Sequence, residues 1–182
     1  SAIRLSLVGS VLCIRASRSF LDSALSEGYR QLQGGEEGLD VVVAIIQRME
    51  DSPLFNAGKG SVYTWDGKHE LDASIMHGAQ LNAGAVAGVT TVQSPIALAR
   101  AVMEQSPHVM LASKGAELFA RELGVPEMSP AYFETERRKR ALESYKARKQ
   151  AGVEPRVDYK FGTVGVVVLD SKGNLVAGTS TG

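Results

Sequence analysis

The spacing of apolar side chains predicts four helices. The first is expected from Ser19 to about Gln33 and the second from Glu36 to about Asp51, where Pro53 stops it. A third begins at Ser94-Pro95 and runs to about Gln105, and a fourth covers Ser113 to Leu123. Apolar residues recur every three to four positions in the first two helices, at Phe20, Ala24, Leu25, Tyr29 and Leu32, and at Leu39, Val42, Val43, Ile46 and Met49.

Shorter apolar runs predict strands between and after these helices. Val62–Trp65 and Glu70–Met76 flank Asp66-Gly67, a pair typical of hairpin turns, and Ala83 to Val92 forms a further strand rich in small residues. Val166 to Leu169 is a continuous apolar run, typical of a strand buried on both faces. A turn and a return strand, Leu175–Ala177, complete a second hairpin.

Two segments leave alternatives open. Leu5 to Ile14 is apolar and rich in β-branched residues, which favours a buried strand, although its flanking arginines give it a weak likeness to a signal peptide; it is too short to cross a bilayer. Residues 124–160 are highly charged and predict an exposed helix and flexible linker. A nucleic-acid-binding arm is the alternative for its basic residues, but acidic residues are interspersed and no clear aromatic stacking platform accompanies them. The basic residues are Arg137, Arg138, Lys139, Arg140, Lys146, Arg148 and Lys149.

Composition narrows the classes of function. The 182 residues are 44% hydrophobic and carry no net charge, which indicates one soluble domain without a general attraction to nucleic acid or membrane. The single cysteine, Cys13, cannot form an internal disulfide, and together with the weak signal-like segment it favours a cytoplasmic location. His69, His77 and His108 are scattered without zinc-like spacing, so we interpret them as surface or packing residues.

The second hairpin carries the candidate chemistry. Thr163 opens its first strand directly after Gly162, and the return strand ends in Thr179-Ser180-Thr181-Gly182, which the hairpin would bring beside Thr163. A threonine hydroxyl is a weak nucleophile, but a free α-amine on the same residue titrates near neutrality and can act as its general base. Producing that amine requires cleavage after Gly162, where glycine tolerates a strained backbone. The pattern therefore predicts a threonine hydrolase that is made as an uncleaved precursor.

The segment Phe55–Ser61 resembles the end of a phosphate-binding loop only superficially. The first glycine of that motif would fall at Pro53, and Gly60 stands where the magnesium-binding hydroxyl belongs. Its glycines instead predict a tight turn with close backbone approach. Asn56 either points its amide at a substrate or caps this turn.

Several ordered motifs across roughly residues 20–182 resemble the plant-type L-asparaginase/isoaspartyl peptidase family of N-terminal-nucleophile (Ntn) hydrolases. They are Asp51–Gly60, Glu70–Met76, Ala83–Val89, Ala97–Glu104 with Pro107-His108, and Phe161–Val166 with Thr179–Gly182. The resemblance implies an α+β fold of the αββα four-layer sandwich type. It also implies a division into an α-subunit region, 1–162 with an exposed linker at about 124–160, and the start of a β-subunit, 163–182.

The resemblance further implies roles for individual residues. Thr163 would be the nucleophile, freed when the precursor cleaves itself between Gly162 and Thr163, while Thr181 would tune it and Asn56 would lie near the catalytic centre. The expected reaction is hydrolysis of β-aspartyl (isoaspartyl) dipeptides and of L-asparagine through an acyl-enzyme, with release of L-aspartate and without an organic cofactor. A structural Na⁺ would be held by the main-chain carbonyls of Met49, Glu50, Ser52, Phe55, Ala57 and Lys59. The partners expected are a small-molecule or dipeptide substrate and a second αβ unit in a homodimer, with no nucleic acid and no membrane.

Two departures from the family pattern set the alternatives. The family's His-Gly-Gly-Ala-Gly type turn is absent between Ser1 and Phe20, which suggests that the first twenty residues are foreign to the fold. The chain ends at Gly182, before the family's substrate-binding arginine and aspartate and its oxyanion Thr-Gly pair, so this chain alone is expected to be nearly inactive and poorly soluble. The alternatives are a glycosylasparaginase-type amidase and an inert fragment that acts only by binding.

Overall fold

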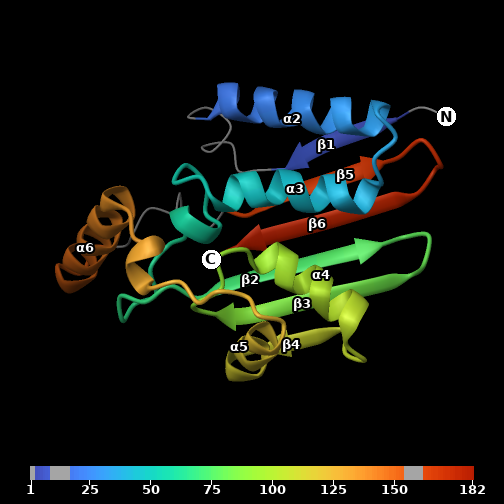
Figure 1. The fold of residues 1–182 in the computed structure, drawn as a ribbon. Coiled ribbons are helices and arrows are strands. Elements are labelled where there is room, and N and C mark those ends of the chain that lie inside the picture. Colours follow the sequence, from blue (N-terminus) through green and yellow to red (C-terminus); the bar gives the residue numbers. More distant parts are fainter. Residues whose placement is uncertain (1–2, 9–16, 154–161) are drawn as a thin grey trace.

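The computed structural model describes residues 3–8, 17–153 and 162–182. Their strands form one six-stranded sheet in the order β1-β5-β6-β2-β3-β4 (Figure 1). All neighbouring strands are antiparallel except β3 and β4, which are parallel. The strands are β1 (Arg4–Val8), β2 (Leu71–His77), β3 (Asn82–Val89), β4 (Met110–Ala112), β5 (Val164–Leu169) and β6 (Leu175–Thr181).

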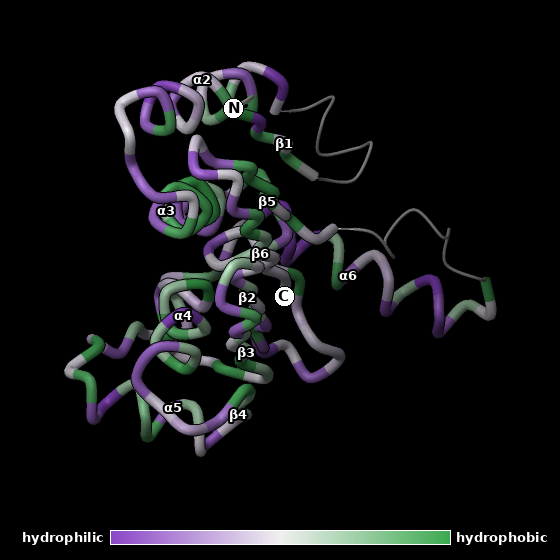
Figure 2. The backbone as a smooth tube through the Cα atoms, turned by 90° about the vertical axis from the view of Figure 1, so that its right-hand side faces the viewer, coloured by the Kyte–Doolittle hydropathy of each residue, from purple (hydrophilic) through white to green (hydrophobic). Residues whose placement is uncertain are grey.

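Helices gather on one side of this sheet. Figure 2 shows α2, α3, α4 and α5 on that side, whereas α6 stands apart on the other. The described α-helices are α2 (Arg18–Gln33), α3 (Gly38–Glu50), α4 (Pro95–Gln105), α5 (Ser113–Glu122) and α6 (Glu136–Gln150), with short 3₁₀ turns η1 (Gly58–Gly60) and η2 (Pro130–Tyr132). A mixed α+β fold is therefore confirmed.

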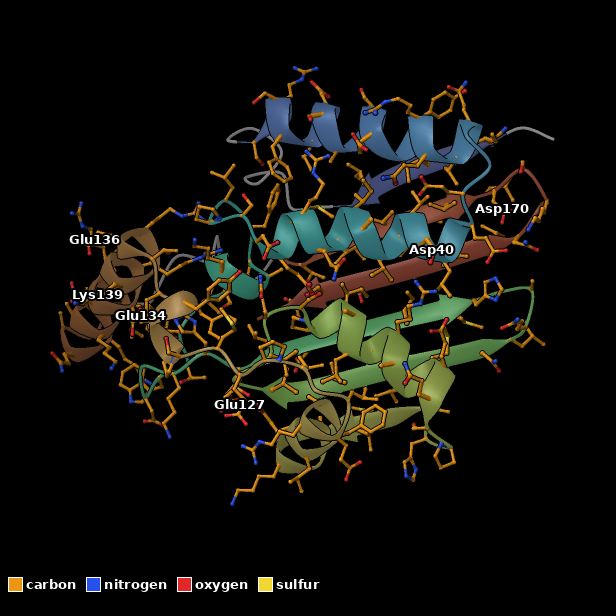
Figure 3. The ribbon with its side chains drawn as sticks, in the orientation of Figure 1. Asp40, Glu127, Glu134, Glu136, Lys139 and Asp170 are labelled. Carbon is orange, nitrogen blue, oxygen red and sulfur yellow. The ribbon has the colours of Figure 1, made fainter. Side chains whose placement is uncertain are left out.

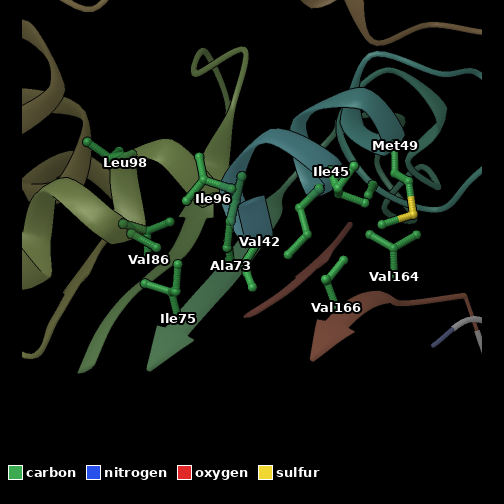
Figure 4. Close-up of a cluster of buried hydrophobic side chains, with 14 of the residues drawn as sticks. Val42, Ile45, Met49, Ala73, Ile75, Val86, Ile96, Leu98, Val164 and Val166 are labelled. Atoms are coloured by element: carbon green, nitrogen blue, oxygen red, sulfur yellow. The ribbon is translucent and has the colours of Figure 1, made fainter. Parts of the chain in front are cut away.

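The core lies between the sheet and two of these helices. Helix α3 packs on β5 and β6, and α4 packs on β2 and β3. Their apolar stripes meet the inward side chains of the strands, as Figure 4 shows for Val42 and Ile45 of α3 and Ile96 of α4 against Ile75 and Val166. Burying each such side chain contributes about 2 kcal/mol, so this contact is the main stabilising layer.

The opposite face of the sheet mixes small or polar side chains with the exposed apolar Met76, Val167 and Leu175. In β2, Leu71, Ala73 and Ile75 are buried while the intervening residues are exposed, and β6 alternates in the same way. On the exposed face the Ser74 and Thr179 hydroxyls lie 2.8 Å apart. The alternation holds the inward side chains on α3 and α4, and it thereby fixes the register of the strands.

The four predicted helices are confirmed to within two residues at each end. The Ser94 hydroxyl caps α4 by accepting a hydrogen bond from the Ala97 amide, as the Ser-Pro start indicates. Residues 124–160 do contain an exposed helix, α6, which has no buried residue. The short strand β4 escaped prediction because its three residues are too few to show a periodicity.

Three strand predictions need correction. Val62–Trp65 is not a strand: a tight turn across Asp66-Gly67 is present, with Thr64 N bonded to Lys68 O at 2.7 Å, but the Val62 amide is bound to the Asn56 side chain. The predicted strand Glu70–Met76 corresponds to β2, which pairs with β3 and β6 and not with Val62–Trp65. Strand β5 is not buried on both faces, because Val167 is 37% exposed on the face away from the helices. The return strand of the second hairpin is longer than predicted and extends to Thr181.

At the N-terminus, β1 pairs with β5 along the edge of the sheet, with Leu5 opposite Val168. This supports the strand interpretation for the first part of the Leu5–Ile14 run; residues 9–16, including Cys13, lie outside the described residues. Within the described ranges, no helix is long and apolar enough to cross a membrane.

Candidate active site

The β5–β6 hairpin places two threonines side by side at its open end. Thr163 directly precedes β5, Thr181 ends β6, and the register pairs Val164 with Ser180. The Thr163 hydroxyl donates a hydrogen bond to Thr181 Oγ1 at 3.1 Å. Thr163 is solvent-exposed and Thr181 is half-buried, so a substrate can approach the first hydroxyl while the second is held by the protein.

Asn56 reaches the same point from the loop that follows α3. Its Oδ1 accepts a hydrogen bond from the Val62 amide at 2.8 Å, and its Nδ2 lies 3.5 Å from Thr181 Oγ1, at the long limit for a hydrogen bond. The side chain is almost fully buried. The capping role is confirmed at Oδ1, while Nδ2 faces Thr181; contact of this amide with a substrate stays a prediction.

Gly162 lies against Asn56. A Cβ added at this position would come within 2.7 Å of Asn56 Cβ and 3.1 Å of its Nδ2. Any other residue would displace the amide that faces Thr181. The glycine before Thr163 is therefore required by close approach, in addition to its tolerance of strained backbone.

The loop between α3 and η1 is held by similarly close backbone contacts. Gly58 has a φ of +50°, and a Cβ there would lie 2.4 Å from the Glu50 carbonyl oxygen; at Gly60 it would lie 2.1 Å from the Phe55 carbonyl oxygen. The predicted tight turn is confirmed. Main-chain carbonyls are consequently crowded between the end of α3 and η1, the stretch that contains the six residues with predicted carbonyl contacts to sodium.

These carbonyls retain capacity to bind a cation. Met49 O accepts one backbone hydrogen bond, from Ser52 N, and Ala57 O accepts one, from Gly60 N, both at 3.2 Å. A carbonyl oxygen has two lone pairs, so each can also contact a hard cation such as Na⁺. In the part of the chain that the structure describes, no group of His, Cys, Asp or Glu side chains could hold a metal ion. Sodium binding by the six main-chain carbonyls stays a prediction, and the hydrogen bonds of Met49 O and Ala57 O are compatible with it.

The side chain of Glu50 was not predicted from the sequence to take part in the site. Its carboxyl is completely buried beneath the threonine pair and accepts hydrogen bonds from Ser180 Oγ at 2.6 Å, Ser94 Oγ at 2.7 Å and Ile96 N at 3.0 Å. Burial raises its pKa to about 7, even though these hydrogen bonds act in the opposite direction. A glutamate four positions after Ile46, on the apolar stripe of α3, was the available signal.

Helix α6 contacts the outer side of the same loop. Arg138 Nε donates to Gly60 O at 2.7 Å, and the Arg137 guanidinium donates to Pro53 O and Leu54 O at 2.9 and 3.0 Å. These three carbonyls differ from the six in the predicted sodium set. The linker helix therefore joins the loop that carries Asn56 through two arginines.

His69 packs beneath this region. Its Nδ1 lies 2.9 Å from Ser61 Oγ, and its ring lies 4.1 Å from that of Tyr63 between centres. Burial lowers its pKa, which favours the neutral ring. The side chain is buried and has the packing role expected of it, whereas His108 is exposed.

Comparison with known proteins agrees with this arrangement. A family model described as asparaginase matches residues 10–182. The chain belongs to this asparaginase family. The match begins ten residues earlier than the predicted resemblance, and β1 (Arg4–Val8) pairs with β5 within the sheet, so this strand is not foreign to the fold.

Curated relatives extend the family assignment. The chain is 47% identical over 169 residues to an isoaspartyl peptidase of Escherichia coli (strain K12), covering 89% of this chain and 52% of that protein. It is 46% identical over 159 residues to the isoaspartyl peptidase/L-asparaginase of Rattus norvegicus and to that of Homo sapiens, covering 87% of this chain and 47% and 51% of those proteins. The chain thus spans about half the length of these relatives.

Proposed function

We propose that this chain is the nucleophile-bearing part of an amidohydrolase precursor that cleaves β-aspartyl (isoaspartyl) dipeptides and the side-chain amide of L-asparagine. The observation that carries the proposal is the 3.1 Å hydrogen bond from Thr163 to Thr181, with Gly162 against Asn56. The names of the family relatives, isoaspartyl peptidase and L-asparaginase, support this substrate class. The product released is L-aspartate, together with an amine or ammonia.

The first step would be self-cleavage of the Gly162–Thr163 bond. Thr163 Oγ1 attacks the Gly162 carbonyl carbon, the carbon–nitrogen bond breaks as the nitrogen gains a proton, and the glycyl group becomes an ester on the threonine. Water hydrolyses this ester to a Gly162 carboxylate and restores the hydroxyl. The Thr163 α-amine is then free. Thr181 Oγ1 orients the attacking hydroxyl by accepting its hydrogen bond.

The same hydroxyl would then act on substrate. The α-amine of Thr163 takes the hydroxyl proton as the oxygen attacks the side-chain amide carbonyl, and it delivers a proton to the leaving amine. Water attacks the resulting aspartyl ester and releases L-aspartate. Asn56 contributes by holding Thr181 from the other side, since its Nδ2 faces Thr181 Oγ1.

Four further features belong to the proposal. A Na⁺ held by the main-chain carbonyls of Met49, Glu50, Ser52, Phe55, Ala57 and Lys59 would keep the loop of Asn56 in place, and no organic cofactor is required. The exposed face of the sheet would pack on a second sheet, which completes a four-layer αββα sandwich. Residues 1–162 would form the α-subunit region and 163–182 the start of the β-subunit. The complete protein would be a cytoplasmic homodimer of αβ units.

Intact mass followed over time tests the proposal. The unmutated chain should release a fragment that begins at Thr163, whereas Thr163→Ala should keep a single mass. Thr179→Ala is the matched control, because Thr179 lies two residues from Thr181 on β6 and its hydroxyl contacts Ser74 instead. Self-cleavage in Thr163→Ala would contradict the assignment, and so would a loss of self-cleavage in Thr179→Ala equal to that in Thr163→Ala. A stable single mass in the unmutated chain would contradict it as well.

A further inference from the structure

A cavity lies between α6 and the segment Val62–Trp65, and neither Thr163 nor Thr181 lines it. Its volume is about 430 Å³, within the range of small-molecule sites. In Figure 1, α6 stands at the side of the molecule, separate from the helices that cover the sheet. The lining residues are Val62, Tyr63, Trp65, Arg138, Ala141, Leu142, Tyr145 and Lys149.

Aromatic rings form two walls of this cavity. Trp65 is 48% exposed, and its ring meets that of Tyr145 edge-on, with centres 6.2 Å apart. Tyr63 lines the same space. The two walls come from segments eighty residues apart, so they form a platform that the sequence alone does not reveal. An exposed aromatic platform of this kind stacks flat rings.

Two lysines surround the tryptophan. Lys149 Nζ lies 4.6 Å and Lys146 Nζ 5.3 Å from the centre of the Trp65 ring. Cations at these distances from an indole are attracted to its face. Lys149 lines the cavity itself, and Lys146 lies beside the same ring. A ligand that enters beside Trp65 therefore meets positive charge at once.

Charge is strongly segregated around this site. Helix α6 has seven Lys and Arg residues against two Glu, while the whole chain is balanced at 20 of each sign, so α6 carries a net +5 and the remainder −5. The acidic residues near Tyr63 are Glu134 and Glu136, at the start of the helix (Figure 3), and with burial they raise the Tyr63 pKa. The positive end of the cavity is thus the Lys146–Lys149 end.

We propose that this cavity binds a small planar aromatic anion. The flat ring would lie against Trp65 and Tyr145, and its carboxylate or phosphate would face Lys146 and Lys149. The aromatic walls account for the ring, and the two ammonium groups account for the charge. The site does not depend on the proposed hydrolase chemistry, because Trp65 and α6 both precede Gly162 and remain in one piece after cleavage there.

The protein contains its own reporter, since Trp65 is its single tryptophan. Its fluorescence, excited at the red edge where the probes do not absorb, should change on titration with AMP and with benzoate. Adenosine and benzamide have the same rings without the acidic group and should bind about tenfold more weakly. Inorganic phosphate and acetate test the charge without a ring and should bind weakest, and binding of AMP should weaken with added salt.

Paired variants test the contacts. Lys146→Gln with Lys149→Gln should weaken AMP binding about tenfold, whereas Lys139→Gln with Arg140→Gln removes the same charge from α6 outside the cavity and should change it less than about twofold. Tyr145→Ala should weaken the binding of both AMP and benzoate while leaving Trp65 in place as the reporter. The circular dichroism spectrum of each variant should match that of the unmutated chain.

Four results would overturn the proposal. The first is the absence of a fluorescence change with either AMP or benzoate, and the second is equal affinity for the charged and the neutral probe of each pair. The third is an equal loss of AMP affinity in the two double variants. The fourth is phosphate binding as tight as AMP binding, which would show a simple anion site in which the ring has no role.

Discussion

The two ends of the β5–β6 hairpin each hold a buried carboxyl, and the pKa values of these two carboxyls are shifted in opposite directions. At the open end, burial raises the pKa of Glu50 to about 7. At the turn, Asp170 (Figure 3) is also buried, but hydrogen bonds outweigh the burial and lower its pKa. The same hairpin thus favours a neutral carboxyl beneath the threonine pair and an ionised one at its turn.

The donors explain the difference. Asp170 accepts hydrogen bonds from the amides of Lys172 and Asn174 at 2.9 Å and from Asn174 Nδ2 at 3.0 Å. An N–H group can only donate, so these partners favour the ionised carboxylate, which only accepts. Glu50 accepts from one amide and two serine hydroxyls. A hydroxyl can donate or accept, so Ser94 and Ser180 satisfy either state of Glu50, and burial then decides.

The largest expected effect is at the turn. Asp170→Ala would leave the Lys172 and Asn174 amides without their acceptor, and we expect a loss of about 3 kcal/mol in the free energy of unfolding, measured with urea at neutral pH. Asp66→Ala, in the exposed turn before β2, is the control and should cost under about 0.5 kcal/mol. Equal losses would show that Asp170 is not the acceptor that holds the turn.

Glu50→Gln should act in the opposite direction. Because the folded pKa is raised from 4.5 to about 7, the unmutated chain holds the full contribution of neutral Glu50 below pH 4.5 and loses it as pH rises to about 7. Glutamine stays neutral, so the variant should lack this loss and be more stable by about 2 kcal/mol at pH 8.

The measurement is urea unfolding of both proteins at several pH values and constant sodium concentration. Parallel pH profiles for Glu50→Gln and the unmutated chain would contradict a raised pKa. Asp170→Asn should instead flatten the acidic part of the profile of unfolding free energy against pH. The contribution of ionised Asp170 to stability is present above pH 3.8 and is lost as pH falls through its lowered folded pKa.

Ser180→Ala should have a smaller effect. It removes one hydroxyl donor from Glu50, which should cost about 1 kcal/mol and raise the Glu50 pKa further. The loss of stability should therefore still begin near pH 4.5 but continue to a higher pH than in the unmutated chain. Urea unfolding across the same pH series measures both changes. Ser74→Ala, on the exposed face of β2, removes a hydroxyl without touching Glu50 and should leave the pH profile unchanged.

The smallest effect concerns the outer side of the Asn56 loop. Arg138→Ala should cost about 1 kcal/mol or less, because its guanidinium bonds the Gly60 carbonyl at the edge of the protein. Arg140→Ala, whose partner Glu136 lies on the same exposed helix, should change stability by less than about 0.5 kcal/mol. If the two variants unfold alike in urea, the contact of α6 with the loop does not stabilise it.

Much of the local structure was predictable because its signals lie close together in sequence. The stripe of α3 repeats within one helix, and the Ser94-Pro95 start positions α4 through a bond to Ala97 only three residues away. The pairing of Thr163 with Thr181 also follows from one hairpin. In contrast, Val62–Trp65 has the apolar pattern of a strand, but its first amide is used by Asn56, a contact that the pattern does not encode.

The sequence by itself determined the helices, the β5–β6 hairpin and the glycine before the candidate nucleophile. Only the tertiary structure decided that Glu50 lies beneath Ser180 and that Trp65 meets Tyr145 on a basic helix. The physical reason is that backbone preference and periodicity act between near neighbours. The burial of a charge and the partners of a hydrogen bond depend instead on which distant segments the fold brings together.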